Sequence, residues 1–508
     1  MKKSLLRTSI LLLFIFALLT SAGCGIILYP TKTPEHTAAE DVQASPQISR
    51  EPYTKLHYSG NIQHFDIPFA ERSRDTFDKS IFIEMFFEFK NIIDNEYVEE
   101  NESRLIELYE KMKSGLLDIK TDVALAEYYY RLDVSDEENA EFYTSKKELY
   151  NSYYGKSLHL FKTVFSTKYA GIFSAHIGDW LADKFSAGGR TVSEEEKALQ
   201  REINDLKLKY DEMIFQDATD TAFKQLYIEI VNANNKYARL LGYDNYAEYA
   251  YIEEFARDYT AKDVKAIEDE IIDEFLPLYI AYVNYAHDNG NIYALYDENN
   301  DSGKEKFTRL RKCIQNISPE LTNSLDHLIR NGLYDVDGSN AKLDASGFTQ
   351  GLYSYNDAYI FIAPNHNVTD YMTVIHEFGH YNRAYYTASD PFSPKGSDDI
   401  EEIMSQGLQL LCYDYYDDYN ESYGSELAMQ TIRQKMRVIL DGFAVNEAEY
   451  LSYTTPNLTI EKLNEIWNKT YDKYGIAFES EENSWIYISG VQKAILLYQL
   501  CYIFSCIL

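Results

Sequence analysis

The chain has 508 residues, of which 45% are hydrophobic and 15% aromatic, and a formal net charge of −33. This composition excludes an intrinsically disordered chain, because it supplies enough apolar surface for a large core. The negative charge disfavours nucleic acid and anionic lipid surfaces as partners, since both carry charge of the same sign. Only 23 glycines and 11 prolines occur, which favours long helices over many short strands and turns.

The first 24 residues have the pattern of an export signal. Three basic residues precede an apolar run, residues 10–19, that is too short to span a membrane as a mature helix. A small-residue cleavage site then ends at Cys24. This resembles a bacterial lipoprotein signal, in which the cysteine is lipidated and becomes the mature N-terminus, and an ordinary secretory cleavage site is the alternative. Both interpretations predict export, and the first predicts a lipid anchor on the extracytoplasmic side of the cell membrane.

Residues 25–55 predict a flexible tether between this anchor and the folded body. Four prolines fall in this stretch among Thr, Ala, Ser, Gln and Glu. Such a composition suits an extended linker better than a packed element. The folded body would then stand away from the membrane.

Helical periodicity dominates from about residue 77 to residue 290. The clearest example starts with a capping box at Ser193–Glu196 and continues with apolar residues three or four positions apart up to Met213. Similar patterns predict helices over residues 82–93, 105–117, 223–241 and 264–275. No repeat of fixed period occurs, so a solenoid is not indicated.

One strand is predicted, over residues 353–362, between Gly351 and Pro364. An exposed edge of this strand could pair with the backbone of an extended peptide. A short packing hairpin is the alternative. Tyr359 and Phe361 are candidates for lining a substrate cleft, and core packing is the alternative for both.

Residues 376–380 read His-Glu-Phe-Gly-His and carry the strongest functional signal. On a helix, His376 and His380 leave the same face one turn apart and can share a metal ion. Two histidines and a downstream carboxylate leave a fourth tetrahedral position for water, which is the ligand arrangement of a catalytic zinc site. Glu377 projects beside them and is the predicted general base. The alternative is a chance match, expected in on the order of one or two per hundred chains of this length.

The third ligand predicted by this pattern is one of two neighbouring glutamates, Glu401 or Glu402. Asp398 and Glu401 fit a capping box, which would engage Glu401 with helix amides and leave Glu402 to face the metal. The residues themselves do not decide between the two.

Two segments together resemble the M3 family of metallopeptidases, the group of oligoendopeptidase F and thimet oligopeptidase: His376–His380 and Glu402-Ile403-Met404-Ser405. In that family the third ligand opens a Glu-x-x-Ser segment somewhat under thirty residues after the first histidine, a place taken here by Glu402. Residues 236–246 also resemble a segment of the family. The similarity extends over roughly residues 205–489.

The resemblance implies a mainly α, two-lobed zincin-type peptidase with a deep substrate channel and a small β-sheet beside the zinc helix. It implies one Zn2+ per chain, held by His376, His380 and Glu402, and a zinc-dependent endopeptidase acting on short peptides. The chain would divide into an N-terminal helical region, residues 56–204, and a catalytic region, residues 205–508. Another zincin with the same helix motif and different substrates is an alternative.

The C-terminal end departs from the family pattern. After a stretch like Trp485–Ile488, the family has a histidine and a tyrosine-rich helix that supply donors to the tetrahedral oxyanion, and neither follows Ser489 here. A change of reading frame near Ser489 would explain the difference, because codons can be chosen for residues 494–506 that spell Pro-Tyr-Tyr-Tyr-Ile-Ser-Tyr-Ala one base later.

This departure changes what is expected of the tyrosines near the end of the chain. Tyr498 and Tyr502 receive no catalytic role, because they would belong to out-of-frame sequence. Tyr487 precedes the break and is a candidate substrate-binding residue. The corresponding alternative function is a catalytically impaired lipoprotein that keeps the zinc site and binds peptides without cleaving them.

Overall fold

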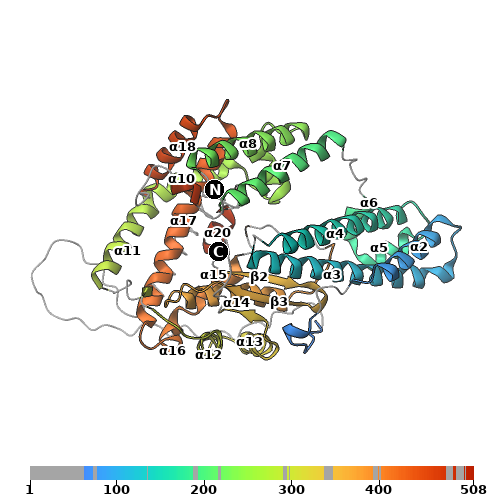
Figure 1. Cartoon of the computed structure of the whole chain (residues 1–508), viewed down its shortest axis with the longest axis horizontal. Helices are drawn as coiled ribbons and strands as arrows, with labels where there is room; N and C mark the ends of the chain where they lie inside the picture. The colour runs from blue at the N-terminus through green and yellow to red at the C-terminus, as the bar shows by residue number, and fades with distance from the viewer. Residues whose placement is uncertain are drawn as a thin grey trace, which may run out of the picture. The chain divides into compact units, whose positions relative to one another are not determined.

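Long α-helices make up most of the structure, as Figure 1 shows, so the mainly α class predicted from the sequence is confirmed. The computed structural model describes residues 62–72, 77–133, 136–186, 193–214, 219–289, 295–296, 298–336, 347–392, 399, 402–475, 484–487, 497 and 499–507. The predicted signal, Cys24 and the tether lie outside these residues. Among the described helices, none combines the length and the apolar character needed to cross a membrane.

The first helices pack on an aromatic core of their own. The long helices α2 (Lys79–Asp94), α3 (Glu102–Leu132) and α4 (Glu137–Val164) contact one another, with α5 (Ala170–Ile177) and α6 (Asp179–Ser186) against them. The predicted helices over residues 82–93 and 105–117 fall inside α2 and α3 and are confirmed. Edge-on ring contacts link Phe89, Tyr109, Phe161 and Phe173, and the same core receives Phe392 from far along the chain.

The helix predicted after the Ser193 capping signal is α7 (Glu194–Ile214). The amide of Glu196 donates to Ser193 Oγ at 3.1 Å, which satisfies one of the free amides of the first turn. Leu199 and Ile203 on α7 bury their side chains against Ala233 and Tyr237 of α8 (Asp220–Leu240). The predicted boundary at residue 204 falls inside α7, so this helix belongs to both predicted regions.

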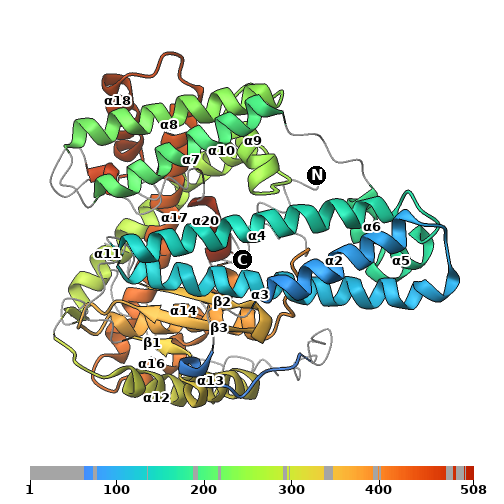
Figure 2. The ribbon, with the colours of Figure 1, turned by 45° about the vertical axis from the view of Figure 1, so that its right-hand side comes forward.

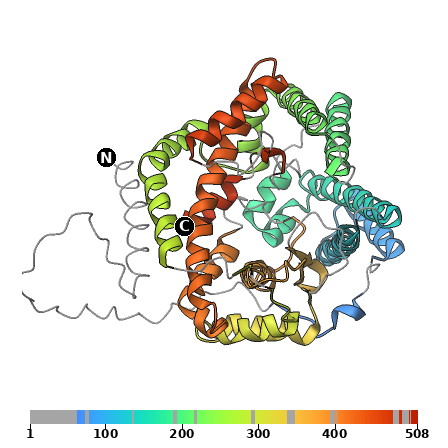
Figure 3. The same cartoon turned by 60° about the vertical axis from the view of Figure 1, so that its left-hand side comes forward.

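The helix predicted over residues 264–275 is only partly regular. α10 (Ala261–Glu270) starts from a Thr260–Asp263 capping box and then passes through a π-helical turn, Ile271–Phe275, into α11 (Leu276–Asn289). Next in the chain come α12 (Gly303–Ile314) and α13 (Pro319–Asn331). Figure 3 shows α11, in yellow-green, beside the orange-red α17 (Gly424–Thr454), which also contacts α18 (Ile460–Lys473).

A three-stranded sheet lies against the helix α14 (Asp370–Tyr385), as Figure 2 shows. The central strand β3 (Asp357–Ile362) runs parallel to β1 (Tyr334–Asp335) and antiparallel to β2 (Gly347–Leu352). Every residue of β3 is buried, which agrees with its apolar sequence.

The strand prediction over residues 353–362 was wrong in two respects. Tyr353–Tyr355 forms a 3-10 turn that joins β2 to β3, and Asn356 completes the turn with a left-handed φ of 47°. β3 is also the central strand, so it does not offer a free edge, and the edge strand on this side is β2. The residues themselves do not reveal this turn, because Tyr353 and Tyr355 have the same high β-propensity as the strand that follows them.

Candidate metal centre

The helix α14 presents one apolar face to the core and one polar face that carries both histidines of the motif. Tyr371, Val374, Ile375, Phe378 and Tyr381 are fully buried on the core side. The helix starts at Asp370, whose carboxylate accepts the amides of Asn365 and His366 at 2.8 and 3.2 Å and pairs with Lys306.

The two imidazole rings lie one turn apart, as the spacing predicted. The ring centroids of His376 and His380 are 4.9 Å apart, and each side chain is 23% exposed. Both rings are therefore partly exposed to solvent, whereas Glu377 and Glu402 beside them are buried.

Gly379 lets a second helix come close to the histidines. A Cβ atom added at Gly379 would lie 2.4 Å from Ser405 Cα and 2.5 Å from the Met404 carbonyl oxygen. Both are backbone atoms at the start of α15 (Ile403–Leu411), so only glycine permits this approach. The close packing brings Glu402, the residue before α15, to the polar face of α14.

Glu402 meets both histidines. Its Oε2 atom lies 3.4 Å from His376 Nε2 and 3.3 Å from His380 Nε2. Two bonds of about 2.0–2.1 Å to one tetrahedral zinc ion would place their ligand atoms roughly 3.3 Å apart, so the residues present fit zinc. Within the described residues these three side chains also form the one group of histidine, cysteine and carboxylate atoms, all within 4.8 Å of each other, that could hold a metal ion. Glu401 lies outside the described residues.

Hydrogen bonds from α15 orient the ligand atoms. Ser405 Oγ donates to Glu402 Oε2 at 2.7 Å. Gln409 Oε1 lies 3.4 Å from His376 Nδ1 and accepts a bond of 2.6 Å from Lys435 Nζ. Because Gln409 Oε1 can only accept, His376 Nδ1 must carry the proton, and the Nε2 lone pair then faces Glu402.

The electrostatics of the site favour the protonation states that a metal requires at two of the three side chains, Glu402 and His376. Burial alone would raise the pKa of Glu402, but His380, His376 and Ser405 outweigh it and lower that pKa to about 2. Burial lowers the pKa of His376 to about 4, whereas for His380 the bond to Glu402 outweighs burial and raises the pKa. At neutral pH Glu402 is therefore ionised and His376 is neutral.

The predicted general base is held by a residue that the sequence reasoning missed. Glu377 is 6% exposed, and Thr349 Oγ1 on β2 donates to its Oε2 at 2.8 Å and to its carbonyl oxygen at 3.0 Å. Thr349 precedes the motif by more than twenty residues and carries no sequence signal, because the contact depends on how β2 packs on α14.

Replacing Thr349 with valine is expected to lower turnover about tenfold with little change in KM. Valine has nearly the same shape as threonine but lacks the hydroxyl, so it removes the donor that orients Glu377. Steady-state kinetics on a peptide substrate measures the effect, with Thr349→Ser, which keeps the hydroxyl, as the control. Wild-type turnover in Thr349→Val would show that Glu377 needs no such support.

Two of the three predicted substrate-binding residues, Tyr359 and Phe361, lie in the core rather than in the site. Tyr359 and Phe361 are 5% and 0% exposed in the core, where Tyr359 stacks on Phe69 and Phe361 on Phe348. This corrects their interpretation as cleft residues and favours the core-packing alternative, because side chains so buried offer a substrate almost no surface. Tyr487 ends the short helix Ser484–Tyr487, but its side chain lies outside the described residues.

The described part of the C-terminal segment brings Tyr502 to the site. Gln406 Nε2 donates to the Tyr502 carbonyl oxygen at 3.0 Å, and Arg257 donates to the Leu497 carbonyl oxygen at the same distance. Burial and the nearby carboxylates of Glu402 and Glu377 raise the pKa of Tyr502. The sequence reasoning assigned this residue no role. Whether the segment is read in frame stays a prediction for nucleotide sequencing to decide.

No protein-family model matches the sequence, and no curated protein matches it. Solved structures match most of its length. An oligoendopeptidase F superposes with a TM-score of 0.69 at 15% identity, covering 87% of this chain and 87% of its own. The chain shares this fold. PZ peptidase A, solved with an inhibitor, superposes with a TM-score of 0.68 at 15% identity, covering 86% of this chain and 88% of its own. An oligoendopeptidase F from Bacillus anthracis str. Ames superposes with a TM-score of 0.65 at 16% identity, covering 86% of this chain and 87% of its own.

Proposed function

We propose that this protein is a zinc-dependent endopeptidase that hydrolyses short peptides. The observation that carries the proposal is the meeting of His376, His380 and Glu402 beside the buried Glu377. Two imidazole nitrogens and one carboxylate oxygen are the ligand set of catalytic zinc sites in metallopeptidases. The fold shared with solved oligoendopeptidases also supports a peptidase.

The protein's own residues divide the chemistry among them. Zinc, when bound, supplies a Lewis acid that activates water and polarises the scissile carbonyl. Glu377 accepts the proton of the attacking water and delivers it to the leaving amine, the two tasks of one general acid–base group. The Thr349 hydroxyl donates a hydrogen bond to Glu377 Oε2 and so holds the carboxylate of the base in one orientation.

The edge strand β2 offers a way to bind peptides with little dependence on their side chains. Among the described strands, β2 pairs only with β3, and its Thr349 contacts the base directly. A peptide added beside β2 would form main-chain hydrogen bonds next to Glu377. We therefore propose that β2, rather than β3, pairs with the peptide.

Removal of the metal tests the proposed activity. We expect the protein to cleave a quenched fluorescent peptide library, to lose this turnover after dialysis against a chelator and to regain it with one equivalent of Zn2+. Magnesium is not expected to restore turnover, because it prefers oxygen ligands. One bound zinc without any cleavage would support the peptide-binding alternative instead, and cleavage that ignores the chelator would contradict a metallopeptidase.

We also propose that the protein is exported and anchored through a lipid on Cys24. The basic, apolar and small-residue parts of residues 1–24 support this proposal. A Cys24→Ala variant is expected to leave the membrane fraction while still being exported. Membrane association unchanged in that variant, measured by fractionation and immunoblotting, would contradict the anchor.

A further inference from the structure

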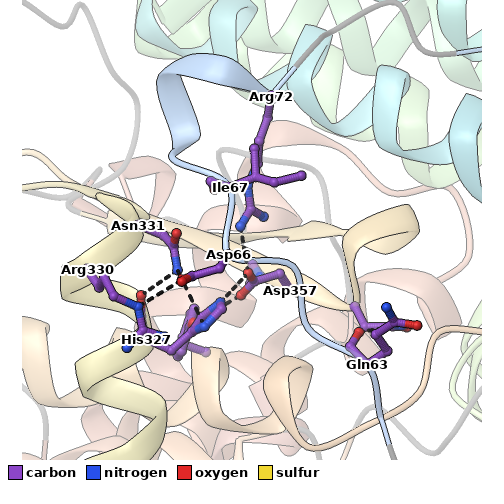
Figure 4. Close-up of polar contacts among 11 residues, drawn as sticks. Gln63, Asp66, Ile67, Arg72, His327, Arg330, Asn331 and Asp357 are labelled. Atoms are coloured by element: carbon purple, nitrogen blue, oxygen red, sulfur yellow. Dashed lines mark hydrogen bonds and ion pairs between the residues drawn. The ribbon is translucent and has the colours of Figure 1, made fainter.

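The segment at residues 62–72 is fastened to the same body that carries α14 (Figure 4). Asp66 accepts bonds from Arg330 and Asn331 of α13 at 2.8 and 3.1 Å. Near the other end of the segment, Arg72 pairs with Asp357, the first residue of β3, at 2.9 Å. The sequence reasoning placed the segment just after the tether and gave it no role.

The two attachments differ in character. Arg330 and Asp66 are 58% and 68% exposed, so their ion pair is screened by water and contributes little. The side chains of Arg72 and Asp357 are both fully buried. Removing one partner of a buried pair is costly, because it leaves a charge in a medium of low dielectric constant.

Asp357 links Arg72 to α14, because its carboxylate is bonded to both. One carboxylate oxygen, Oδ2, accepts from Arg72 and lies 3.0 Å from His327 Nε2. The other, Oδ1, accepts from the hydroxyl of Tyr381 on α14 at 3.0 Å and from the Ala358 amide. Arg72 and Tyr381 therefore share one carboxylate.

Tyr381 is the residue next to His380. Its ring is fully buried on the core face, and successive residues on a helix point about 100° apart. Fixing the Tyr381 hydroxyl therefore fixes the rotation of α14 and with it the direction of His380. One turn further on, His64 of the same segment stacks on Tyr385 of α14, with ring centroids 3.7 Å apart and planes 3° from parallel.

We propose that residues 62–72 clamp the histidine-bearing helix α14, and that Arg72 acts through Asp357 and Tyr381 as a positioning residue for His380. The role of His380 as a zinc ligand rests on the proposed function, whereas the clamp on α14 does not. Residues 62–72 would therefore help to hold the ligand His380 in place, although they lie far from it in the sequence. Partners hydrogen-bonded directly to a metal ligand typically change metal affinity by 10- to 100-fold when removed, and for a support that acts through the neighbouring residue we expect the lower end of that range.

The test compares Arg72→Met with Arg330→Met, which removes the exposed ion pair of the same segment and leaves the Asn331–Asp66 hydrogen bond. In the metal-free protein, Arg72→Met is expected to speed amide hydrogen exchange in α14, and Arg330→Met to leave it unchanged. With metal, Arg72→Met is expected to raise the zinc dissociation constant about tenfold and to lower kcat with little change in KM. Millimolar guanidinium is expected to restore part of the lost activity in Arg72→Ala.

Tyr381→Phe keeps the inference testable if Arg72→Met fails to fold, because it removes only the hydroxyl and keeps the buried ring. It is expected to change exchange and zinc affinity in the same direction as Arg72→Met, and the two effects are not expected to add. Equal effects of Arg72→Met and Arg330→Met, or wild-type behaviour of Tyr381→Phe, would overturn the clamp. A wild-type protein that binds no zinc would sink the proposed function, while hydrogen exchange in α14 would still decide the clamp.

Discussion

Glu377→Gln is expected to lower peptide turnover about a thousandfold while the protein keeps its zinc. A general base contributes on the order of 10²- to 10⁴-fold, and glutamine cannot accept the proton of the attacking water. Glutamine has nearly the same shape and still offers an oxygen to the Thr349 hydroxyl, so the local structure is expected to persist. The measurement is kcat on a quenched peptide library together with zinc content per chain.

Glu402→Gln is the matched control, because it makes the same chemical change at a predicted ligand. In contrast to Glu377→Gln, this variant is expected to bind zinc more weakly. Its turnover is expected to return in part when the zinc concentration is raised. Cleavage that survives Glu377→Gln would refute the assigned base. Zinc loss in Glu377→Gln would show that this residue, too, holds the metal.

Gly379→Ala is expected to weaken both zinc binding and folding. The added methyl would lie 2.4–2.5 Å from backbone atoms of Met404 and Ser405, which cannot move aside as a flexible side chain could. The start of α15 must shift, and Glu402 moves with it. We expect zinc affinity to fall tenfold or more and the free energy of unfolding to fall by about 1–3 kcal/mol, the usual range for overpacking.

The expected loss of stability in Gly379→Ala is opposite in sign to the usual effect of this substitution. Alanine in place of glycine inside a helix ordinarily stabilises by roughly 0.5–1 kcal/mol. Gly407→Ala on α15 is the matched control, since an added Cβ there meets no atom within 4 Å. It is expected to be neutral or stabilising, with unchanged zinc affinity. Denaturant unfolding and zinc titration of both variants measure the contrast, and a stabilised Gly379→Ala would refute the close approach.

Helices could be predicted where capping and periodicity agreed. The Ser193 signal and the apolar spacing after it correspond to a real cap and a buried face on α7, because both depend only on residues within a few turns. The sheet was harder to predict. Tyr353–Tyr355 has the composition of a strand but forms the turn of a hairpin, and burial of β3 comes from its neighbours rather than from its own alternation.

Local spacing is enough to place His376 and His380 on one helix face beside Glu377, because residues four apart share a face on any α-helix. That position 379 must be glycine follows only from the close approach of α15 in the structure. Only the tertiary structure placed Glu402 at 3.3–3.4 Å from both imidazoles and Thr349 on Glu377. These contacts join residues far apart in the chain, so their distances follow from how α14, α15 and β2 pack and not from any local spacing.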